Sequence, residues 1–299
     1  MVGETVEKKL YNAASEGDLT TLQTLLQEDP YLVHEAPFAY SRNLLHVAAM
    51  HGQAAIVEEV LKMNPRLATS LDSKNLSPLH IAAAEGSLEI VKKLLSLAPE
   101  ACWWRDCHDM NPIHIAAMNG HVEILEELLK ESHLPAMERL HRGQTVFHLC
   151  VKHGQLTTLM VLVDKLGELV RAKDDDGETL LHLAVRSNQL AIVAFLVAFK
   201  IIKTQTPNSR GKTELKILLE SPPDTSNYSE MHKILKKLQD RSKWEPVKLT
   251  DTAMVVVVLI ASMAFQVAIS PPRQRMTGRQ RRTRGRPSHH GIYSSLIVQ

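Results

Sequence analysis

The feature that most constrains the fold of this chain is a histidine that recurs every 34 residues. An apolar residue precedes each copy, a small residue stands two positions after it, and a glycine or asparagine stands six positions after it. The five copies are His46, His80, His114, His148 and His182. Agreement at several positions with one fixed period indicates internal repetition. The chain is therefore expected to stack similar units against one another rather than to enclose a single core.

Each unit is predicted to be a turn followed by two helices. Three residues before each histidine stands Asn, Ser or Thr, which cap helix N-termini, and Pro78 and Pro112 occupy the first helical position. Five residues before it stand residues that mostly tolerate the left-handed conformation of a turn, namely Ser41, Asn75, Asp109, Gly143 and Gly177. The later glycine closes the first helix, and a second helix with one aliphatic face follows.

The unit resembles the ankyrin repeat, and the stretch SPLHIAAAEGSLEIVKKLL at residues 77–95 matches that pattern closely. An earlier copy has Tyr11 in place of the histidine, and a last copy has Lys216 there and Pro222 in place of the glycine. Degenerate ends are typical of a solenoid. The resemblance implies an all-α ankyrin-repeat solenoid over residues 1–220, with six recognisable repeats and a degenerate seventh.

No catalytic or metal-binding pattern is evident, and no cofactor is expected. The five repeat histidines are interpreted as structural, since the family's histidine hydrogen-bonds around the hairpin. Cys102, Cys107 and His108 lack the paired spacing of a zinc site. Gly211-Lys212-Thr213 resembles the end of a phosphate-binding loop, but Thr206 stands where the loop needs glycine. The chain is therefore predicted to be a binding scaffold and not an enzyme.

In ankyrin proteins the turn tips and first helices form a concave face that binds protein partners. The register places variable side chains there, and the row is basic at the fourth and fifth repeats and acidic at the sixth. The candidate partner-binding residues are Tyr40, Arg42, Lys74, Leu76, Trp104, Arg105, His108, Met110, Arg139, His141, Arg142, Lys173, Asp175 and Asp176. Trp103 and Trp104 are either interface anchors or packed under the neighbouring hairpin.

The region after the repeats contains two apolar features. Residues 221–251 are predicted to be a linker with a short amphipathic helix, which either packs on the last repeat or lies at a membrane surface. Residues 252–269 carry no charge. As a helix of ~1.5 Å rise per residue they reach ~27 Å, close to the ~30 Å of a bilayer core. One transmembrane helix is predicted, with a buried core segment as the alternative.

Residues 252–272 also resemble the first span of a plant family that joins ankyrin repeats to a membrane domain named for a Pro-Gly-Gly motif. Within that family the bian-da-type immune proteins are the most similar. The resemblance implies cytosolic repeats at a membrane, in defence or stress signalling, with the plasma membrane as the favoured site. Here Pro272 is followed by Arg273 and no second long apolar run, so multi-span functions are not implied.

The formal net charge of +2 hides a division within the chain. Residues 1–272 carry 28 basic and 33 acidic side chains, whereas residues 273–299 carry seven arginines and no acid. The second part is interpreted as a disordered basic tail. Two functions stay open: a membrane-associated adaptor that binds a protein, and a soluble or nuclear regulator whose tail binds nucleic acid or import receptors. Basic residues on both sides of 252–269 leave the topology open.

Overall fold

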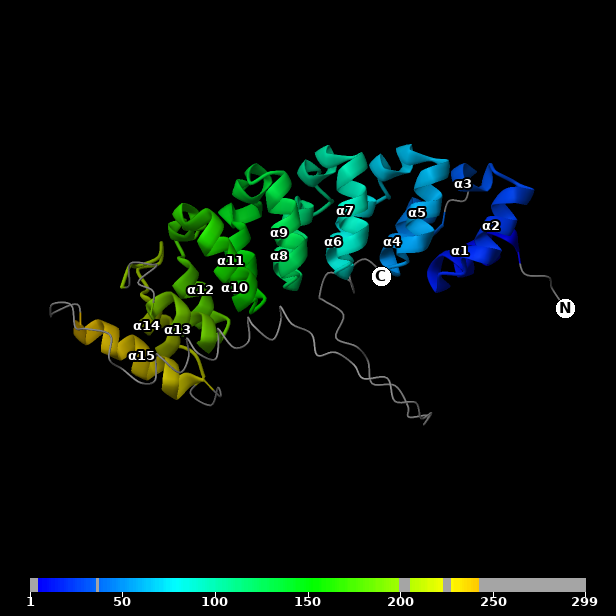
Figure 1. Cartoon of the computed structure of the whole chain (residues 1–299). Coiled ribbons are helices and arrows are strands. Elements are labelled where there is room, and N and C mark those ends of the chain that lie inside the picture. The colour runs from blue at the N-terminus through cyan, green and yellow to red at the C-terminus, as the bar shows by residue number, and fades with distance from the viewer. Residues whose placement is uncertain (1–4, 36–37, 199–204, 223–226, 242–299) are drawn as a thin grey trace, which may run out of the picture. The chain divides into compact units, whose positions relative to one another are not determined.

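The computed structural model describes residues 5–35, 38–198, 205–222 and 227–241 (Figure 1). Within these ranges the regular elements are helices, and the only pairing of extended backbone is a single antiparallel bridge between Phe38 and Arg42. The chain divides into two compact units, which meet in sequence between His141 and Arg142. Each unit is described by itself.

The first unit consists of helix pairs with short 3-10 segments between them. Its α-helices are α1 (Val6–Glu16), α2 (Leu19–Glu28), α3 (Leu32–Glu35), α4 (Leu44–Met50), α5 (Ala54–Met63), α6 (Pro78–Glu85), α7 (Leu88–Leu97), α8 (Pro112–Asn119) and α9 (Val122–Glu131). Its 3-10 segments are η1 (Ala39–Ser41), η2 (Pro65–Thr69), η3 (Pro99–Trp103) and η4 (Leu134–Met137).

The second unit repeats the arrangement. Its α-helices are α10 (Val146–Lys152), α11 (Leu156–Leu166), α12 (Leu180–Arg186), α13 (Leu190–Ala198), α14 (Glu214–Leu219) and α15 (Tyr228–Arg241). Its 3-10 segment η6 (Gly167–Arg171) follows α11, and η5 (His141–Gly143) spans the boundary between the units.

The predicted helix signals are confirmed. Ser77 and Asn111 are the N-caps of α6 and α8, and Pro78 and Pro112 are the first residues of those helices. Gly86 and Gly120 close the same two helices in the left-handed region, with φ of 86° and 81°. A glycine adopts this conformation without the steric cost that a Cβ imposes, so each helix ends where its glycine stands.

In the regular repeats of the first unit, the first helix of each pair is buried on nearly all sides and the second is buried along one face. In the first unit α4, α6 and α8 stack in sequence, and α5, α7 and α9 pack against them. Every residue of α6 from Pro78 to Ala84 is buried, whereas α7 buries Ile90, Val91, Leu94 and Leu95. The core of each unit therefore lies between the two layers of helices, and no single pair encloses one.

The degenerate copies at the ends form helix pairs as well. Tyr11 in α1 replaces the repeat histidine, and its ring lies edge-on to the ring of Phe38, with centroids 5.4 Å apart. At the other end α15 packs on α13 and α14, with Met231 and Leu235 buried. Of the two outcomes that the sequence leaves open for this amphipathic stretch, packing on the last repeat is observed.

The predicted membrane segment at 252–269 and the basic tail at 273–299 lie outside the described residues. Among the helices of the described ranges, none has both the length and the apolar character needed to cross a membrane.

Candidate functional site

In four of the repeats the loop that enters the helix pair is a hairpin shaped by one polar side chain at its start. Asp72 Oδ1 accepts hydrogen bonds from the backbone N–H groups of Lys74 (2.8 Å) and Leu76 (2.9 Å). Asp106 Oδ1 accepts from His108 (2.8 Å) and Met110 (2.9 Å). Such Asx turns hold a hairpin without help from outside it.

The same device recurs in the second unit. Asp174 Oδ1 accepts from the Glu178 N–H at 2.8 Å, and Asn208 Oδ1 accepts from the Lys212 N–H at 2.9 Å. The sequence analysis missed these residues. The signal was present, because positions 72, 106, 174 and 208 share the repeat register, although Phe38 and Leu140 interrupt the series.

Neighbouring hairpins within each unit are joined through their backbones. In the first unit the Ser73 N–H donates to the Tyr40 carbonyl at 2.9 Å, and the Cys107 N–H donates to the Lys74 carbonyl at 3.0 Å. In the second unit the Asp175 N–H donates to Arg142 at 3.1 Å, and the Ser209 N–H donates to Asp176 at 3.0 Å. These bonds hold the tips in register, so the side chains on them occupy fixed positions.

The predicted left-handed positions are confirmed, and in two hairpins the residue directly before the predicted one adopts the same conformation. The five predicted residues are Ser41 (φ 56°), Asn75 (58°), Asp109 (63°), Gly143 (66°) and Gly177 (70°). Tyr40 (φ 63°) and Arg142 (φ 62°) are also left-handed. A bulky aromatic residue in this region is strained, and such strain persists only where the surrounding structure enforces it.

Tyr40 is the aromatic side chain at the first tip and is 39% exposed. Lys74 Nζ lies 4.9 Å from the centroid of its ring, and the guanidinium carbon of Arg42 lies 5.3 Å from it. Cation–π attraction therefore holds the Lys74 ammonium beside an exposed ring. This pair gives the first tip both an apolar surface and a positive charge.

The next tips of the first unit carry further exposed charges. Arg105 pairs with Glu138, the closest N···O distance being 3.0 Å, and lies 3.8 Å from Asp109. His108 is exposed, with its Nδ1 3.3 Å from the sulfur of exposed Cys107, and Arg139 and His141 are also exposed. Met110 is half-buried. The first unit thus presents predominantly basic tips, with Arg105 already held by two carboxylates.

The two tryptophans before the Asp106–Met110 hairpin differ. Trp103 is 40% exposed, whereas the side chain of Trp104 is half-buried. The Trp104 carbonyl accepts a hydrogen bond from His80 Nε2 at 3.0 Å, which ties this segment to the preceding repeat. Of the pair, Trp103 is the more available for contact with another molecule.

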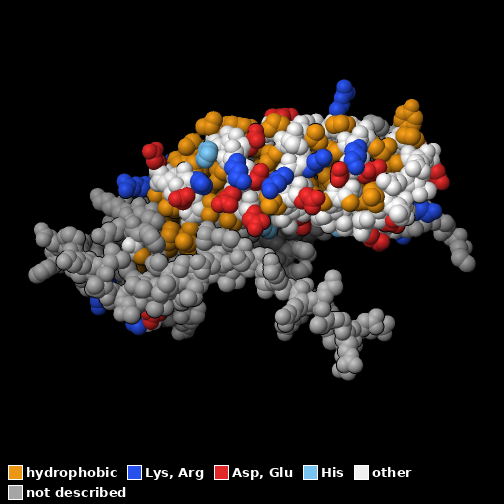
Figure 2. Space-filling model, viewed as in Figure 1, with side chains coloured by type: hydrophobic (Ala, Val, Ile, Leu, Met, Phe, Trp, Pro, Cys, Tyr) orange, Lys and Arg blue, Asp and Glu red, His pale blue; other side chains and the backbone are white. Residues whose placement is uncertain are grey.

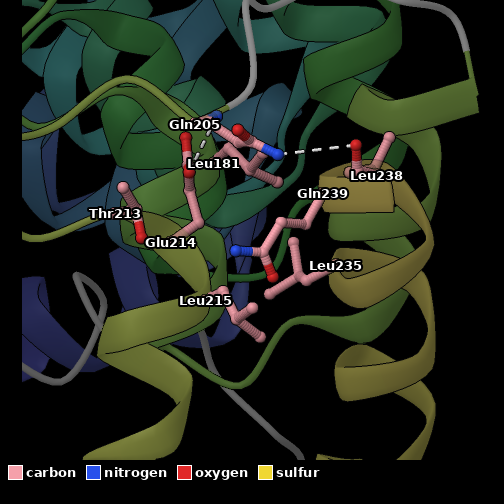
Figure 3. A pocket seen from close by; sticks show the side chains of 8 residues that line it. All are labelled: Leu181, Gln205, Thr213, Glu214, Leu215, Leu235, Leu238 and Gln239. Carbon is pink, nitrogen blue, oxygen red and sulfur yellow. Dashed lines mark hydrogen bonds between the residues drawn. The ribbon is translucent and has the colours of Figure 1, made fainter. Parts of the chain in front are cut away.

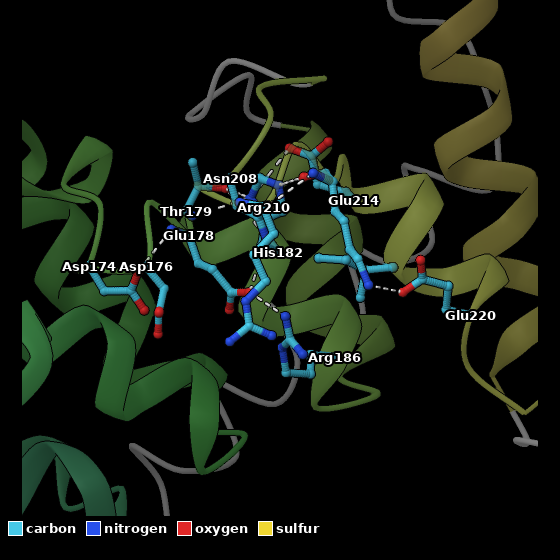
Figure 4. A network of polar contacts seen from close by, with 12 residues as sticks. Asp174, Asp176, Glu178, Thr179, His182, Arg186, Asn208, Arg210, Glu214 and Glu220 are labelled. Atoms are coloured by element: carbon cyan, nitrogen blue, oxygen red, sulfur yellow. Dashed lines mark hydrogen bonds and ion pairs between the residues drawn. The ribbon is translucent and has the colours of Figure 1, made fainter.

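The tips of the second unit carry charges of both signs. Arg142 forms an ion pair with Asp176, and Lys173 and Asp175 are exposed. Behind them Glu178 is buried and accepts hydrogen bonds from Arg186 and from Asn208 Nδ2, the latter at 3.3 Å (Figure 4). This network fixes the acidic hairpin against the one that follows it.

Two of the predicted partner-binding residues point inward. Arg42 is 4% exposed and its Nε donates to Asp72 Oδ2 at 3.2 Å, while Leu76 is 2% exposed. Both lie on the returning limb of a hairpin, where the side chain faces the helices rather than solvent. Both side chains are thus withdrawn from solvent, while partner binding by the tip residues stays a prediction.

The repeat histidines join each helix to its cap and to the following repeat. His80 Nδ1 accepts from the Ser77 N–H at 3.1 Å, so the ring proton is on Nε2, which donates to Trp104. His46 and His182 bond in the same way to the carbonyls of Leu76 and Lys212, each at 3.1 Å. His114 and His148 accept from the N–H of their own cap residues, Asn111 and Thr145.

Burial keeps three of these histidines neutral. Loss of solvent lowers the pKa of His46 and of His80 to about 4, and that of His114 to about 3. The backbone carbonyls that they contact offset only part of this effect. Neutral imidazoles held by their own helix caps serve the fold.

Within each unit, helix pairs stack side by side, and a histidine at the start of the first helix of each regular pair bonds to the helix N-cap. This arrangement, with hairpins before the helix pairs, defines the class of helical repeat proteins. The chain belongs to the ankyrin repeat family. A family model described as ankyrin repeats (3 copies) matches residues 10–102 and 113–210, and another described as ankyrin repeats (many copies) matches residues 79–129.

Among solved structures, the fold is similar to that of the human ASB11 ankyrin repeat domain. The two share 22% sequence identity with a TM-score of 0.63, and the match covers 80% of this chain and 99% of that one. A comparison with curated proteins finds no match. Ankyrin repeats are typically non-catalytic scaffolds for protein–protein interaction.

Charges of both signs are interspersed over the face of the molecule shown in Figure 2. Exposed ion pairs on the second helices, such as Lys130 with Glu127 at 2.9 Å, have the same mixed character. Such pairs contribute little to stability and do not create a field of one sign. The chemistry that distinguishes one surface from another is therefore found at the hairpin tips.

Proposed function

We propose that this chain is an adaptor that binds a protein partner through the hairpin tips of its ankyrin repeats. The observation that carries the proposal is the rigid framework of the tips, in which Asx turns and backbone bonds between hairpins hold exposed Tyr40, half-buried Lys74 and exposed Arg105 in fixed positions. Pre-organised aromatic and cationic side chains bind with little loss of conformational entropy.

The adaptor is further proposed to act at a membrane, in plant defence or stress signalling. The support is the uncharged stretch at residues 252–269 and the resemblance of residues 252–272 to the Pro-Gly-Gly family of plant ankyrin proteins. In this proposal the plasma membrane holds residues 252–269 and the repeats face the cytosol.

The alternative is a regulator in the cytosol or nucleus. It is favoured by the seven arginines between Arg273 and Arg286, because clustered arginines attract phosphates and import receptors without requiring a folded site. The two proposals share the protein-binding repeats and differ only in what the region after residue 251 does.

Site-specific photo-crosslinking tests the binding surface. A photoreactive residue is placed in the full chain at Lys74 or Arg139, both on tips, and as a control at Lys92, an exposed position on α7. Adducts with a protein partner are expected from the two tip positions and not from the control. Equal adducts from Lys92 would show that the partner binds the second helices instead.

Vesicle flotation separates the two locations. The full chain is expected to float with neutral phosphatidylcholine vesicles, and the variant V256D/L259D is expected to remain at the bottom of the gradient. A variant with the seven tail arginines changed to glutamine is the control and is expected to float as the unaltered chain does, because neutral vesicles offer no net charge to a basic tail. An unaltered chain that stays at the bottom of the gradient would support the soluble regulator.

A further inference from the structure

A cavity of about 110 Å³ lies in the second unit between α12, α14 and α15 (Figure 3). Leucines form much of its wall, and the remaining lining side chains are polar. The lining residues are Leu181, Gln205, Thr213, Glu214, Leu215, Leu235, Leu238 and Gln239. The cavity therefore offers an apolar wall of four leucines together with four polar side chains.

Glu214 departs from the repeat register. It is the first residue of α14, and the first residue of each corresponding helix is apolar: Leu44, Pro78, Pro112, Val146 and Leu180. The carboxyl group is nevertheless buried as its apolar counterparts are, with Glu214 only 2% exposed. Burying a carboxylate is costly unless it is paired and hydrogen-bonded, so the position requires partners that an apolar residue does not.

The carboxyl group of Glu214 is incompletely satisfied. Oε2 accepts a hydrogen bond from the Gln205 N–H at 3.1 Å, whereas Oε1 has no hydrogen-bond partner among the described residues. A carboxylate can accept about four hydrogen bonds through its two oxygens, so most of its acceptor capacity is unused.

His182 does not supply the missing proton. Its Nδ1 lies 3.9 Å from Glu214 Oε1, beyond hydrogen-bonding distance, and already accepts from the Thr179 N–H at 3.2 Å. Its ring proton is on Nε2, which bonds to the Lys212 carbonyl. Burial raises the pKa of Glu214, and backbone hydrogen bonds and the charge of Lys173 offset only part of that rise. The carboxyl group therefore needs a donor that the described residues do not provide.

We propose that this cavity binds a primary ammonium or guanidinium group carried on a short alkyl chain. The cationic head donates to the Glu214 carboxylate. Rotation about the last side-chain torsion of Glu214, which has a broad energy minimum, orients the carboxylate toward the cavity. The alkyl chain lies against Leu181, Leu235 and Leu238. A dry cavity of ~150 Å³ admits benzene, so the smaller volume here suits a chain of about three or four carbons.

This chemistry has two possible sources. The head group and stem are those of a lysine or arginine side chain, and seven arginines lie in this chain between Arg273 and Arg286. A second molecule, either a free amine or a basic side chain of a partner, offers the same group. If the chain's own arginines are the source, the cavity of the full chain is already filled. If a second molecule is the source, the cavity of the full chain is open to it.

The test measures binding of n-butylammonium and n-butylguanidinium to the full chain by calorimetry, with n-butanol as the uncharged probe of equal length. Glu214→Gln keeps the size of the side chain and removes its charge, and is expected to weaken binding of both cations at least tenfold. Glu220→Gln changes an exposed carboxylate at the C-terminal end of α14, and is expected to leave binding unchanged. Thermal unfolding of each variant verifies that it is folded.

A second arm identifies the source, using the full chain with its seven tail arginines changed to glutamine. Tighter binding of n-butylammonium by this variant assigns the cavity to the chain's own arginines, and equal binding assigns it to an external cation. The proposal is overturned if Glu214→Gln binds the cations as well as the unaltered chain, if n-butanol binds equally well, or if neither full-length form binds the cations saturably.

Discussion

At the scale of single residues, buried neutral histidines make the first unit sensitive to mild acid. In the unfolded chain a histidine has a pKa of about 6.5, whereas in the folded unit that of His80 is about 4. The unfolded state therefore binds protons first as the pH falls. Stability is fully present above pH ~6.5 and is lost progressively toward pH ~4, by on the order of 3 kcal/mol for each such histidine.

Urea unfolding between pH 7.5 and 5.0 measures this loss, within a range where most carboxylates remain ionised. The variant His80→Gln is expected to be less stable at pH 7.5 but to lose less stability on acidification, because one titrating group has been removed. His108→Gln, at an exposed position, is the control and should follow the unaltered chain. An unchanged pH slope in His80→Gln would contradict the assignment.

Individual side chains show which features could be predicted from the sequence and which could not. The capping residues and left-handed positions were predictable, because each depends on local backbone chemistry repeated in every copy. The burial of Arg42 and Leu76 was not, since it depends on which side of a hairpin limb faces the helices. Likewise Glu214 reads as an ordinary polar residue of a degenerate repeat until the cavity beside it is seen.

At the scale of elements, the hairpin at Ser41 has a strained backbone conformation that glycine would adopt at a lower energy cost. Ser41 has φ of 56°, in a region that costs an L-residue about 1 kcal/mol or more. Ser41→Gly is expected to raise the free energy of unfolding by about 1 kcal/mol, seen as a higher denaturant midpoint. Ser73→Gly is the matched control: its φ is not positive, so glycine there adds only chain entropy and should give no gain.

The helix pairs are the elements that could be predicted most fully from the sequence. Each pair was predicted because caps, apolar faces and closing glycines agree, and α6 and α8 begin and end where those signals stand. The Asx turns of the hairpins share the 34-residue register but were overlooked, since Asp72 and Asp106 also read as ordinary loop residues. The position of α15 needed the structure, because an amphipathic helix with a lysine-rich face suits a repeat or a membrane surface equally.

At the scale of the whole molecule, the repeat period does not reveal the division into two units. The spacing of 34 residues continues from His114 to His148, across the boundary after His141. A repeat protein is stabilised by contacts between neighbouring repeats. Repeats that pack against one another are therefore expected to unfold together. Helix pairs with neighbours on both sides should resist opening more than pairs at an end.

Hydrogen exchange measured by mass spectrometry tests this expectation. Amides of α6, which packs against both α4 and α8, are expected to exchange most slowly, and those of α14 and α15 to exchange fastest among the paired helices. Leu94→Ala, at a fully buried site of α7, should cost about 2–5 kcal/mol and speed exchange in α6 and in its neighbours. Because α14 belongs to the other compact unit, its exchange in Leu94→Ala reports whether the two units open together. Slow exchange in α14 equal to that in α6 would show that the degenerate repeat is as stable as the regular ones, contrary to this prediction.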